Sequence, residues 1–294
     1  MIRIFLFLLT NLSIVSILFI LGLFIKLNIY VFFFVIVSTF LTGFGGAIIS
    51  LLLSKRIALF SVGGKIITDP ANDREKWAFK KIKKQASKLN LKTPEFAIYD
   101  SDSFNAFATG ATKNSSVVAV STALLHKMRK NELEAVIAHE ISHISNGDMV
   151  TMTLLQGILN TFTIFLSNGL SHMFCSMIFG EDNTSENLRQ RKIGYHYYIT
   201  LFLEIIFGIL ASFITMWFSR KREFYADAGA AKLSSIENMI AALKTLEYHA
   251  YLINEPKNVN ALCINGSINN FFYLLASHPP INTRIKALNK KKYM

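Results

Sequence analysis

Cysteine is scarce in this sequence, with only two among 294 residues. Cys175 falls within an apolar stretch, and Cys263 lies far from it. A disulfide framework needs several pairs and a cysteine zinc site needs clustered sulfur ligands, so neither is indicated. The sequence also lacks a glycine-rich loop that ends in Lys-Ser or Lys-Thr. We therefore expect no role for ATP.

Acidic residues are also few. The 19 Asp and Glu stand against 31 Lys and Arg, which gives a formal net charge of +12. Such an excess can indicate nucleic-acid binding, but the basic residues lie outside the apolar stretches and no aromatic-basic RNA motif is evident. Nucleic acid is therefore not an expected partner. We expect the basic residues to face anionic lipid headgroups instead.

Apolar residues are abundant, since they make up 52% of the chain and include 25 Phe. Four long stretches contain many of them: Ile4–Ile25, Tyr30–Leu53, Met149–Phe179 and Ile193–Phe218. About 20 apolar residues suffice for a helix to cross the hydrocarbon core of a bilayer. The sequence therefore predicts two hydrophobic helical hairpins, with about four membrane helices.

Two features of these stretches bear on packing and function. Small residues in the second stretch, among them Gly43, Gly45 and Gly46, would let another helix approach closely. The fourth stretch contains an acid, Glu204. Because a carboxylate inside a membrane usually faces a bundle interior or a cavity, Glu204 is a functional candidate, although a packing role is favoured.

The charge pattern predicts how the chain is oriented. Most Lys and Arg fall in two polar segments, residues 54–148 and 219–294. Basic loops stay on the cytoplasmic side of a membrane, so both segments are predicted to be cytoplasmic. Two hairpins give the same answer, since an even number of crossings returns the chain to its starting side. We expect a first hairpin at 1–53, a second at 149–218, and one cytoplasmic domain formed by the polar segments.

The first polar segment contains both helical and strand patterns. Asp73–Leu89 is typical of an amphipathic helix, and its many lysines either contact headgroups or simply face solvent. Glu95–Tyr99 predicts a short strand, and Asn105–Thr109 with Val117–Val120 predicts a hairpin. The expected fold class is therefore membrane α-helical plus α+β.

The residues from Ala138 to Asp148 read AHEISHISNGD. On a helix, His139 and His143 lie one turn apart on the same face, where two imidazoles can bind one Zn²⁺. Glu140 would then lie beside the metal and act on its bound water. Two helical histidines can also be ordinary polar surface, so the motif alone leaves both interpretations open.

Neighbouring residues support a helix here. Asn131 with Glu134 has the spacing of a capping box, and Gly147 is a typical helix stop. The residues expected on the buried side are Leu133, Val136, Ile137 and Ile141. A catalytic zinc needs a third protein ligand as well, so a further His, Glu or Asp must come from elsewhere in the chain.

Candidates for the third ligand follow the fourth apolar stretch directly. Glu223 and Asp227 are four residues apart and share one helical face. Glu223 can complete a His₂Glu zinc site, and Asp227 can accept the second N–H of a ligating imidazole. The alternative is a charged surface patch where the chain leaves the membrane, although basic residues alone would be usual there.

With these motifs in place, the sequence resembles the HtpX-type membrane metallopeptidases, the bacterial branch of the integral-membrane gluzincins that also include the CAAX prenyl proteases. The resemblance spans nearly the whole chain and includes the N-terminal hydrophobic hairpin. It rests on four spaced motifs: NAFATG at 105–110, HEISH at 139–143, EFYAD at 223–227 and HPPINTR at 278–284.

The resemblance implies a role for each motif. His139, His143 and Glu223 would bind one zinc ion per chain, with Glu140 as general base. It also implies a zincin-like cytoplasmic domain in which His278 steadies the oxyanion and Arg284 pairs with Asp227. The substrate would add as a further strand along an edge strand formed by Asn105, Ala106, Phe107, Ala108, Thr109 and Gly110.

The implied function is a zinc endopeptidase of the bacterial inner membrane, crossing it several times with its protease domain in the cytoplasm. Its substrates would be unfolded or damaged membrane proteins, in a stress-response, quality-control role. Two alternatives stay open. One is a CAAX-type prenyl protease, although that branch is longer and has more membrane helices. The other is a catalytically silent membrane scaffold, which would not need a carboxylate at Glu140.

Overall fold

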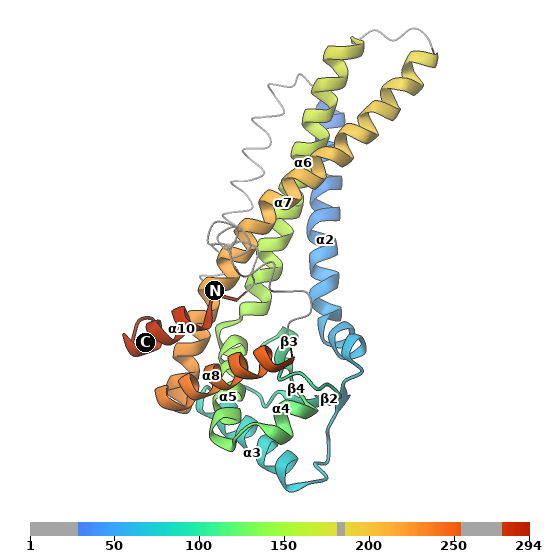
Figure 1. Ribbon diagram of the computed structural model, residues 1–294. Helices are drawn as coiled ribbons and strands as arrows, with labels where there is room; N and C mark the ends of the chain where they lie inside the picture. Colours follow the sequence, from blue (N-terminus) through green and yellow to red (C-terminus); the bar gives the residue numbers. More distant parts are fainter. Residues whose placement is uncertain (1–28, 181–185, 254–277) are drawn as a thin grey trace. The chain divides into compact units, whose positions relative to one another are not determined.

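The computed structural model describes residues 29–180, 186–253 and 278–294. Their elements, in chain order, are α2 (Ile29–Val62), β1 (Lys65–Ile66), α3 (Asp73–Lys88), β2 (Glu95–Tyr99), β3 (Ala106–Thr112), β4 (Ser115–Ser121), α4 (Thr122–Lys127), α5 (Lys130–Asn146), α6 (Asp148–Phe179), α7 (Glu186–Leu233), α8 (Ile236–Ile253) and α10 (Ile281–Asn289) (Figure 1). These described residues are therefore mostly helical and contain one small sheet. It divides into two compact units, residues 1–49 with 153–215 and residues 50–152 with 216–294.

Three helical segments among the described residues are long and apolar enough to cross a membrane: Phe40–Val62, Asp148–Phe179 and Glu186–Leu233. The expected helix at Ile4–Ile25 lies outside the described residues. The fourth apolar stretch is part of a longer helix than predicted, because α7 begins at Glu186, before Ile193, and continues past Phe218 to Leu233. Its 48 residues thus include both the apolar stretch with Glu204 and the acids that follow it.

Within the first unit, α2 and α6 approach closely at small residues. A methyl group added at Gly43 would lie 2.8 Å from the backbone nitrogen of Thr161, and one added at Gly157 would lie 3.1 Å from the ring of Phe44. Such contacts need glycine, so the expected close packing is confirmed at Gly43. Among the described residues, no atom lies within 4 Å of a methyl group added at Gly45 or Gly46.

The sheet belongs to the second unit and has the strand order β1-β2-β4-β3. Strands β2 and β4 are parallel, whereas β3 and β4 form the predicted antiparallel hairpin. Strand β3 begins at Ala106, one residue later than predicted, and lies at an edge with β4 as its one strand neighbour in the described sheet. Gly110 fits the hairpin because its φ of +152° and its contact with Ser116 leave no room for a side chain.

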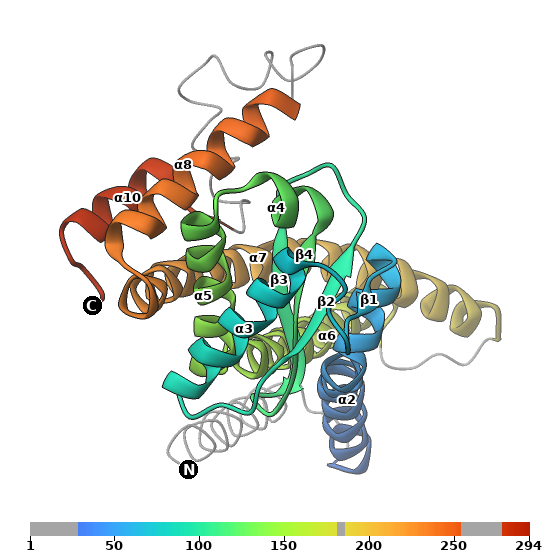
Figure 2. The ribbon, with the colours of Figure 1, turned by 90° about the horizontal axis from the view of Figure 1, so that it is seen from below.

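Both faces of the sheet are covered by apolar side chains of the same unit. One face packs with helices α3, α5 and α8 around a core that includes Ile82, Phe96, Val118, Leu133, Ile137 and Leu243. Figure 2 shows α3 and α5 together on this side of the sheet. On the other face, Tyr99 and Val117 pack against Leu59 near the end of α2. Helix α5 is therefore held rigidly by the core.

Both ends of α5 can be compared with the prediction. Gly147 ends the helix as expected: its φ is 69°, and its N–H bonds to the carbonyls of His143 and Ile144. The predicted capping box is wrong, because α5 begins earlier, at Lys130, and makes no side-chain cap. Tertiary contacts hold the two predicted capping side chains, since Asn131 bonds to Asn238 and Glu134 pairs with Lys81 at 2.6 Å.

Candidate metal centre

Helix α5 brings the two motif histidines together. The Nε2 atoms of His139 and His143 lie 3.1 Å apart, and the two rings are almost perpendicular, at 89°. Their spacing of four residues produces this arrangement, since side chains one helical turn apart face the same side. The buried positions Val136, Ile137 and Ile141 turn the other side of α5 into the core, as the sequence predicted.

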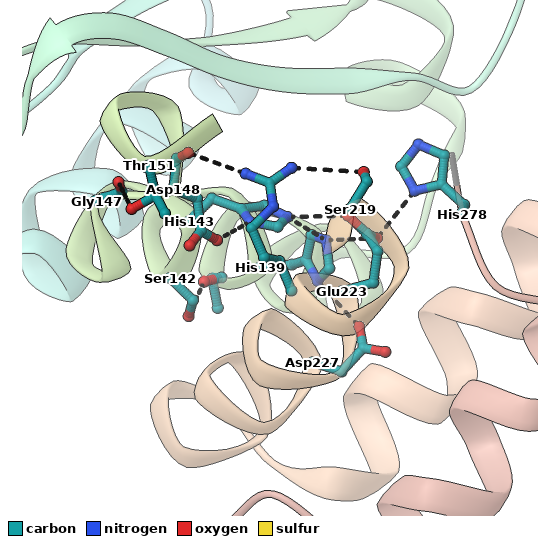
Figure 3. Close-up of polar contacts among 12 residues, drawn as sticks. His139, Ser142, His143, Gly147, Asp148, Thr151, Ser219, Glu223, Asp227 and His278 are labelled. Atoms are coloured by element: carbon teal, nitrogen blue, oxygen red, sulfur yellow. Dashed lines mark hydrogen bonds and ion pairs between the residues drawn. The ribbon is translucent and has the colours of Figure 1, made fainter. Parts of the chain in front are cut away.

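Helix α7 supplies the third side chain of the cluster. Glu223 is 3% exposed, and its Oε1 lies 3.3 Å from Nε2 of His143. Its Oε2 lies 3.5 Å from Nε2 of His139. Figure 3 shows the two imidazoles and this carboxylate pointing towards one another. The ligating atoms of His139, His143 and Glu223 all lie within 4.8 Å of one another.

This cluster fits a zinc ion in its donor set and its spacing. Two nitrogens and one carboxylate oxygen are the protein ligands of a common class of catalytic zinc site. Ligands about 2.0–2.1 Å from one tetrahedral zinc are about 3.3–3.4 Å from each other. The three separations of 3.1, 3.3 and 3.5 Å surround that value. In addition, the buried Oε2 of Glu223 has no well-aligned hydrogen bond.

The charges at the site favour a cation. Burial would lower the pKa of His139, but Asp227 and Glu223 raise it to about 10. Burial would likewise raise the pKa of Glu223, yet the neighbouring imidazoles of His139, His143 and His278 hold it well below its ordinary value. Buried carboxylates that would hold protons on both imidazoles also attract a divalent metal ion.

Glu140 lies on α5 between the two histidines and next to the edge strand. Burial raises the pKa of its carboxyl, whereas the nearby histidines and a hydrogen bond from the backbone of Ala108 on β3 oppose that rise. A carboxylate with a raised pKa can take up a proton and release it again, as a general base requires. The same contact places Ala108, from the predicted edge-strand segment, beside Glu140.

The remaining predicted site residues surround Glu223. Asp227, one turn further along α7, lies 3.0 Å from Nδ1 of His139. Arg284 of α10 makes two hydrogen bonds to Asp227, of 2.8 and 2.6 Å, and lies 3.3 Å from Oε2 of Glu223. His278 is largely exposed, and its Nδ1 lies 2.9 Å from the same oxygen. The structure thus gathers residues from α5, α7 and the segment at 278–284.

Two contacts at the site were not predicted from the sequence. Nδ1 of His143 lies 2.7 Å from Asp148, the first residue of α6. Arg222 of α7 donates a hydrogen bond to the backbone oxygen of Asp148, at 3.1 Å. One feature of the sequence could have predicted the contact between His143 and Asp148. An acid follows the Asn-Gly helix stop directly, at a point where the chain can turn back towards the last turn of α5.

The close approach of α5 and α7 depends on Gly229. A methyl group there would lie 2.5 Å from Oγ and 2.8 Å from Cβ of Ser142, between the two histidines. We expect Gly229→Ala to lower the free energy of unfolding by about 1–3 kcal/mol, because the added carbon overpacks a filled interface. Thermal unfolding in detergent measures this loss.

Two further variants test the cause of that loss. Adding Ser142→Gly to Gly229→Ala should recover stability, because it removes the side chain that the methyl group meets. Gly208→Ala is the matched control on α7, since a methyl group there meets no atom within 4 Å in the described structure. Equal stability of Gly229→Ala and Gly208→Ala would contradict the close contact.

Comparison with known proteins identifies the class to which this site belongs. The profile of peptidase family M48 matches residues 72–292. The Protease HtpX of Wigglesworthia glossinidia brevipalpis is 52% identical over 295 residues, covering 100% of this chain and 99% of that protein. The Protease HtpX of Serratia proteamaculans (strain 568) is 48% identical over 297 residues, covering 100% of both.

A solved structure has a similar fold. The crystal structure of S. mikatae Ste24p matches with a TM-score of 0.54 and 20% sequence identity, over 98% of this chain. This chain spans 65% of the length of that protein. At this identity the match supports the fold alone.

The chain therefore belongs to peptidase family M48, and it is a metalloprotease. Its full-length similarity to these relatives places it among the HtpX-type membrane metallopeptidases. The sequence-based prediction of the family is confirmed. The CAAX prenyl protease alternative has less support, and a catalytically silent scaffold is disfavoured.

Proposed function

We propose that this protein is a zinc endopeptidase of the bacterial inner membrane that cleaves unfolded or damaged membrane proteins. The observation that carries the proposal is the convergence of His139, His143 and Glu223 at separations suited to one zinc ion. These three residues would bind the metal, one ion per chain. When bound, zinc lowers the pKa of a water molecule towards about 7 and polarises the scissile carbonyl.

In this proposal Glu140 moves the protons of the reaction. Its carboxylate takes a proton from the water whose oxygen attacks the carbonyl carbon. As the C–N bond breaks, the same carboxyl gives that proton to the leaving amine. The raised pKa of Glu140 supports this role, because a carboxyl that holds a proton more readily than usual can act first as base and then as acid. Neither a nucleophilic side chain nor ATP is required.

The other site residues position the reacting groups. Asp227 would orient His139, and Arg284 would hold Asp227 through its two hydrogen bonds. His278 would steady the oxyanion, and its exposed side chain and short distance to Glu223 put it close enough to the cluster. The substrate would pair with β3 as an added strand, since β3 lies at a sheet edge and Ala108 contacts Glu140.

The proposed architecture has four membrane helices and a zincin-like domain. Residues 1–53 and 149–218 would form the two hairpins, with Ile4–Ile25 as the first of the four helices. Residues 54–148 and 219–294 would form one cytoplasmic protease domain. The support is the apolar length of each stretch and the concentration of Lys and Arg in the two polar segments.

Proteolysis in the presence of a chelator tests the proposed activity. The full chain, purified in detergent, is expected to cleave casein and an unfolded membrane protein, to lose this activity when a chelator removes its metal, and to regain it when zinc is added. These cleavages should not require ATP. Cleavage that persists after metal removal has been verified would contradict a zinc mechanism.

Reporter fusions test the proposed orientation. Fusions after Lys65 and at Met294 are both expected to give a cytoplasmic signal, because both positions lie in the basic segments. A fusion in the charged segment between the third and fourth apolar stretches, after Glu186, is the matched control and should give a periplasmic signal. A periplasmic signal at either of the first two positions would exclude the four-helix orientation.

A further inference from the structure

His143 has its own carboxylate partner, distinct from the one that contacts His139. Its Nδ1 lies 2.7 Å from Oδ2 of Asp148, and Asp148 is only 7% exposed. None of the roles described above involves this acid. The pair is fully part of the second unit, and Figure 3 shows Asp148 beside the imidazole of His143.

We propose that Asp148 is a positioning residue that fixes His143 as a metal ligand, as Asp227 does for His139. A carboxylate only accepts hydrogen bonds, so Nδ1 of His143 carries the proton in this contact. The lone pair of the ring is then on Nε2, the atom that faces His139 and Glu223. Such a partner also makes the imidazole a more basic ligand. This inference rests on the proposed zinc ligation.

The fold places Asp148 at this position through one turn. Helix α5 ends at Asn146, and Gly147 takes a left-handed conformation with φ 69°. This reversal brings the next residue back beside the last turn of α5, which contains His143. Arg222 of α7 then bonds to the backbone oxygen of Asp148. Asp148, the first residue of α6, is therefore bonded to residues of both α5 and α7.

A simpler role for Asp148 must be distinguished from this one. It is the acidic residue in the first turn of α6, and an acid there stabilises a helix through the helix dipole. Serine is also well suited to a helix start, but its side chain is too short to reach His143 as Asp148 does. Asp148→Ser therefore removes the contact with His143 and leaves a residue that favours the start of α6.

The test is the zinc affinity of the full chain in detergent, measured by competition with chelators. Asp148→Ser is expected to bind zinc about 10- to 100-fold more weakly than wild type, the usual effect of losing a partner of a ligating histidine. The zinc affinity of Asp148→Asn should lie between those of wild type and Asp148→Ser, since the amide oxygen of Asn still accepts a hydrogen bond but carries no charge. The absorption spectrum of the cobalt-substituted protein should change as well, because the ring of His143 is no longer held.

Asp73→Ser is the matched control, because Asp73 is one of two acids in the first turn of α3 and is not part of the metal cluster. It should keep wild-type zinc affinity. Wild-type affinity with an unchanged cobalt spectrum in Asp148→Ser would overturn the proposal and leave Asp148 as a helix-start residue. If Asp148→Ser does not fold, the zinc affinity of Asp148→Asn is the test instead. An affinity of Asp148→Asn equal to that of wild type overturns the proposal. A wild-type chain without zinc would instead refute the proposed function itself.

Discussion

Glu140→Ala is expected to abolish measurable proteolysis while the protein keeps its zinc. Glu140 acts on the water proton and is not among the three ligating residues, so its loss should leave the metal cluster intact. Removal of a general base typically lowers the rate by a factor of roughly 10²–10⁴. Because Glu140 would serve as base and then as acid, we expect a loss at the upper end of that range. The measurements are the cleavage rate of an unfolded membrane protein and the zinc content of the same sample.

Glu134→Ala is the control for this experiment. Glu134 lies on the same helix but pairs with Lys81 of α3 and is not part of the metal cluster, so its removal should change neither zinc content nor cleavage rate. A Glu140→Ala protein that cleaves at nearly the wild-type rate would assign the base to another residue. Loss of zinc from Glu140→Ala would mean that Glu140 contributes to metal binding.

Glu223→Ala should remove the metal almost completely, whereas Asp227→Ala should only weaken its binding. The two carboxylate oxygens of Glu223 lie beside the Nε2 atoms of His139 and His143, so Glu223 is expected to be a direct ligand. Asp227 contacts His139 at Nδ1, the ring nitrogen that faces away from the cluster, and partners of this kind typically contribute about 10- to 100-fold in affinity. Competition with chelators gives both affinities, and proteolysis should fall in the same order.

The order of the two effects is the decisive result. Glu237→Ala, at an exposed acid in the first turn of α8, is the control and should bind zinc as wild type does. If Asp227→Ala is as damaging to zinc affinity as Glu223→Ala, or if Glu223→Ala is harmless, the third ligand has been assigned wrongly. Asp227 would then be the next residue to test as a ligand, followed by His278.

The sequence predicted well those features that depend on local pattern. The spacing of His139 and His143 predicted a shared helix face, and the structure has both on α5. The lengths of the apolar stretches predicted long membrane-type helices. The three predicted strands begin within two residues of the starts of β2, β3 and β4. Gly147 was found because a left-handed residue is needed where a helix stops. These predictions required no knowledge of tertiary contacts.

The sequence failed where distant contacts decide the outcome. Asn131 and Glu134 have the spacing of a capping box, but side chains from α8 and α3 hold them and α5 begins before them. The extent of α7 was missed because apolar length identifies only residues 193–218, whereas the helix continues into charged residues on both sides. The fit of Gly229 against Ser142 is not visible without the packing of α5 and α7. The contact of His143 with Asp148 depends instead on the turn between α5 and α6.

The metal content of the purified wild-type chain tests the central claim most directly. The full chain in detergent, prepared without added metal and analysed by elemental mass spectrometry, is expected to contain close to one zinc ion per chain. The same preparation of His139→Ala, His143→Ala or Glu223→Ala should contain almost none, whereas Glu140→Ala should match wild type. A proteolytically active wild-type chain with no zinc, or a zinc content unchanged in all three ligand variants, would contradict the assignment of this site.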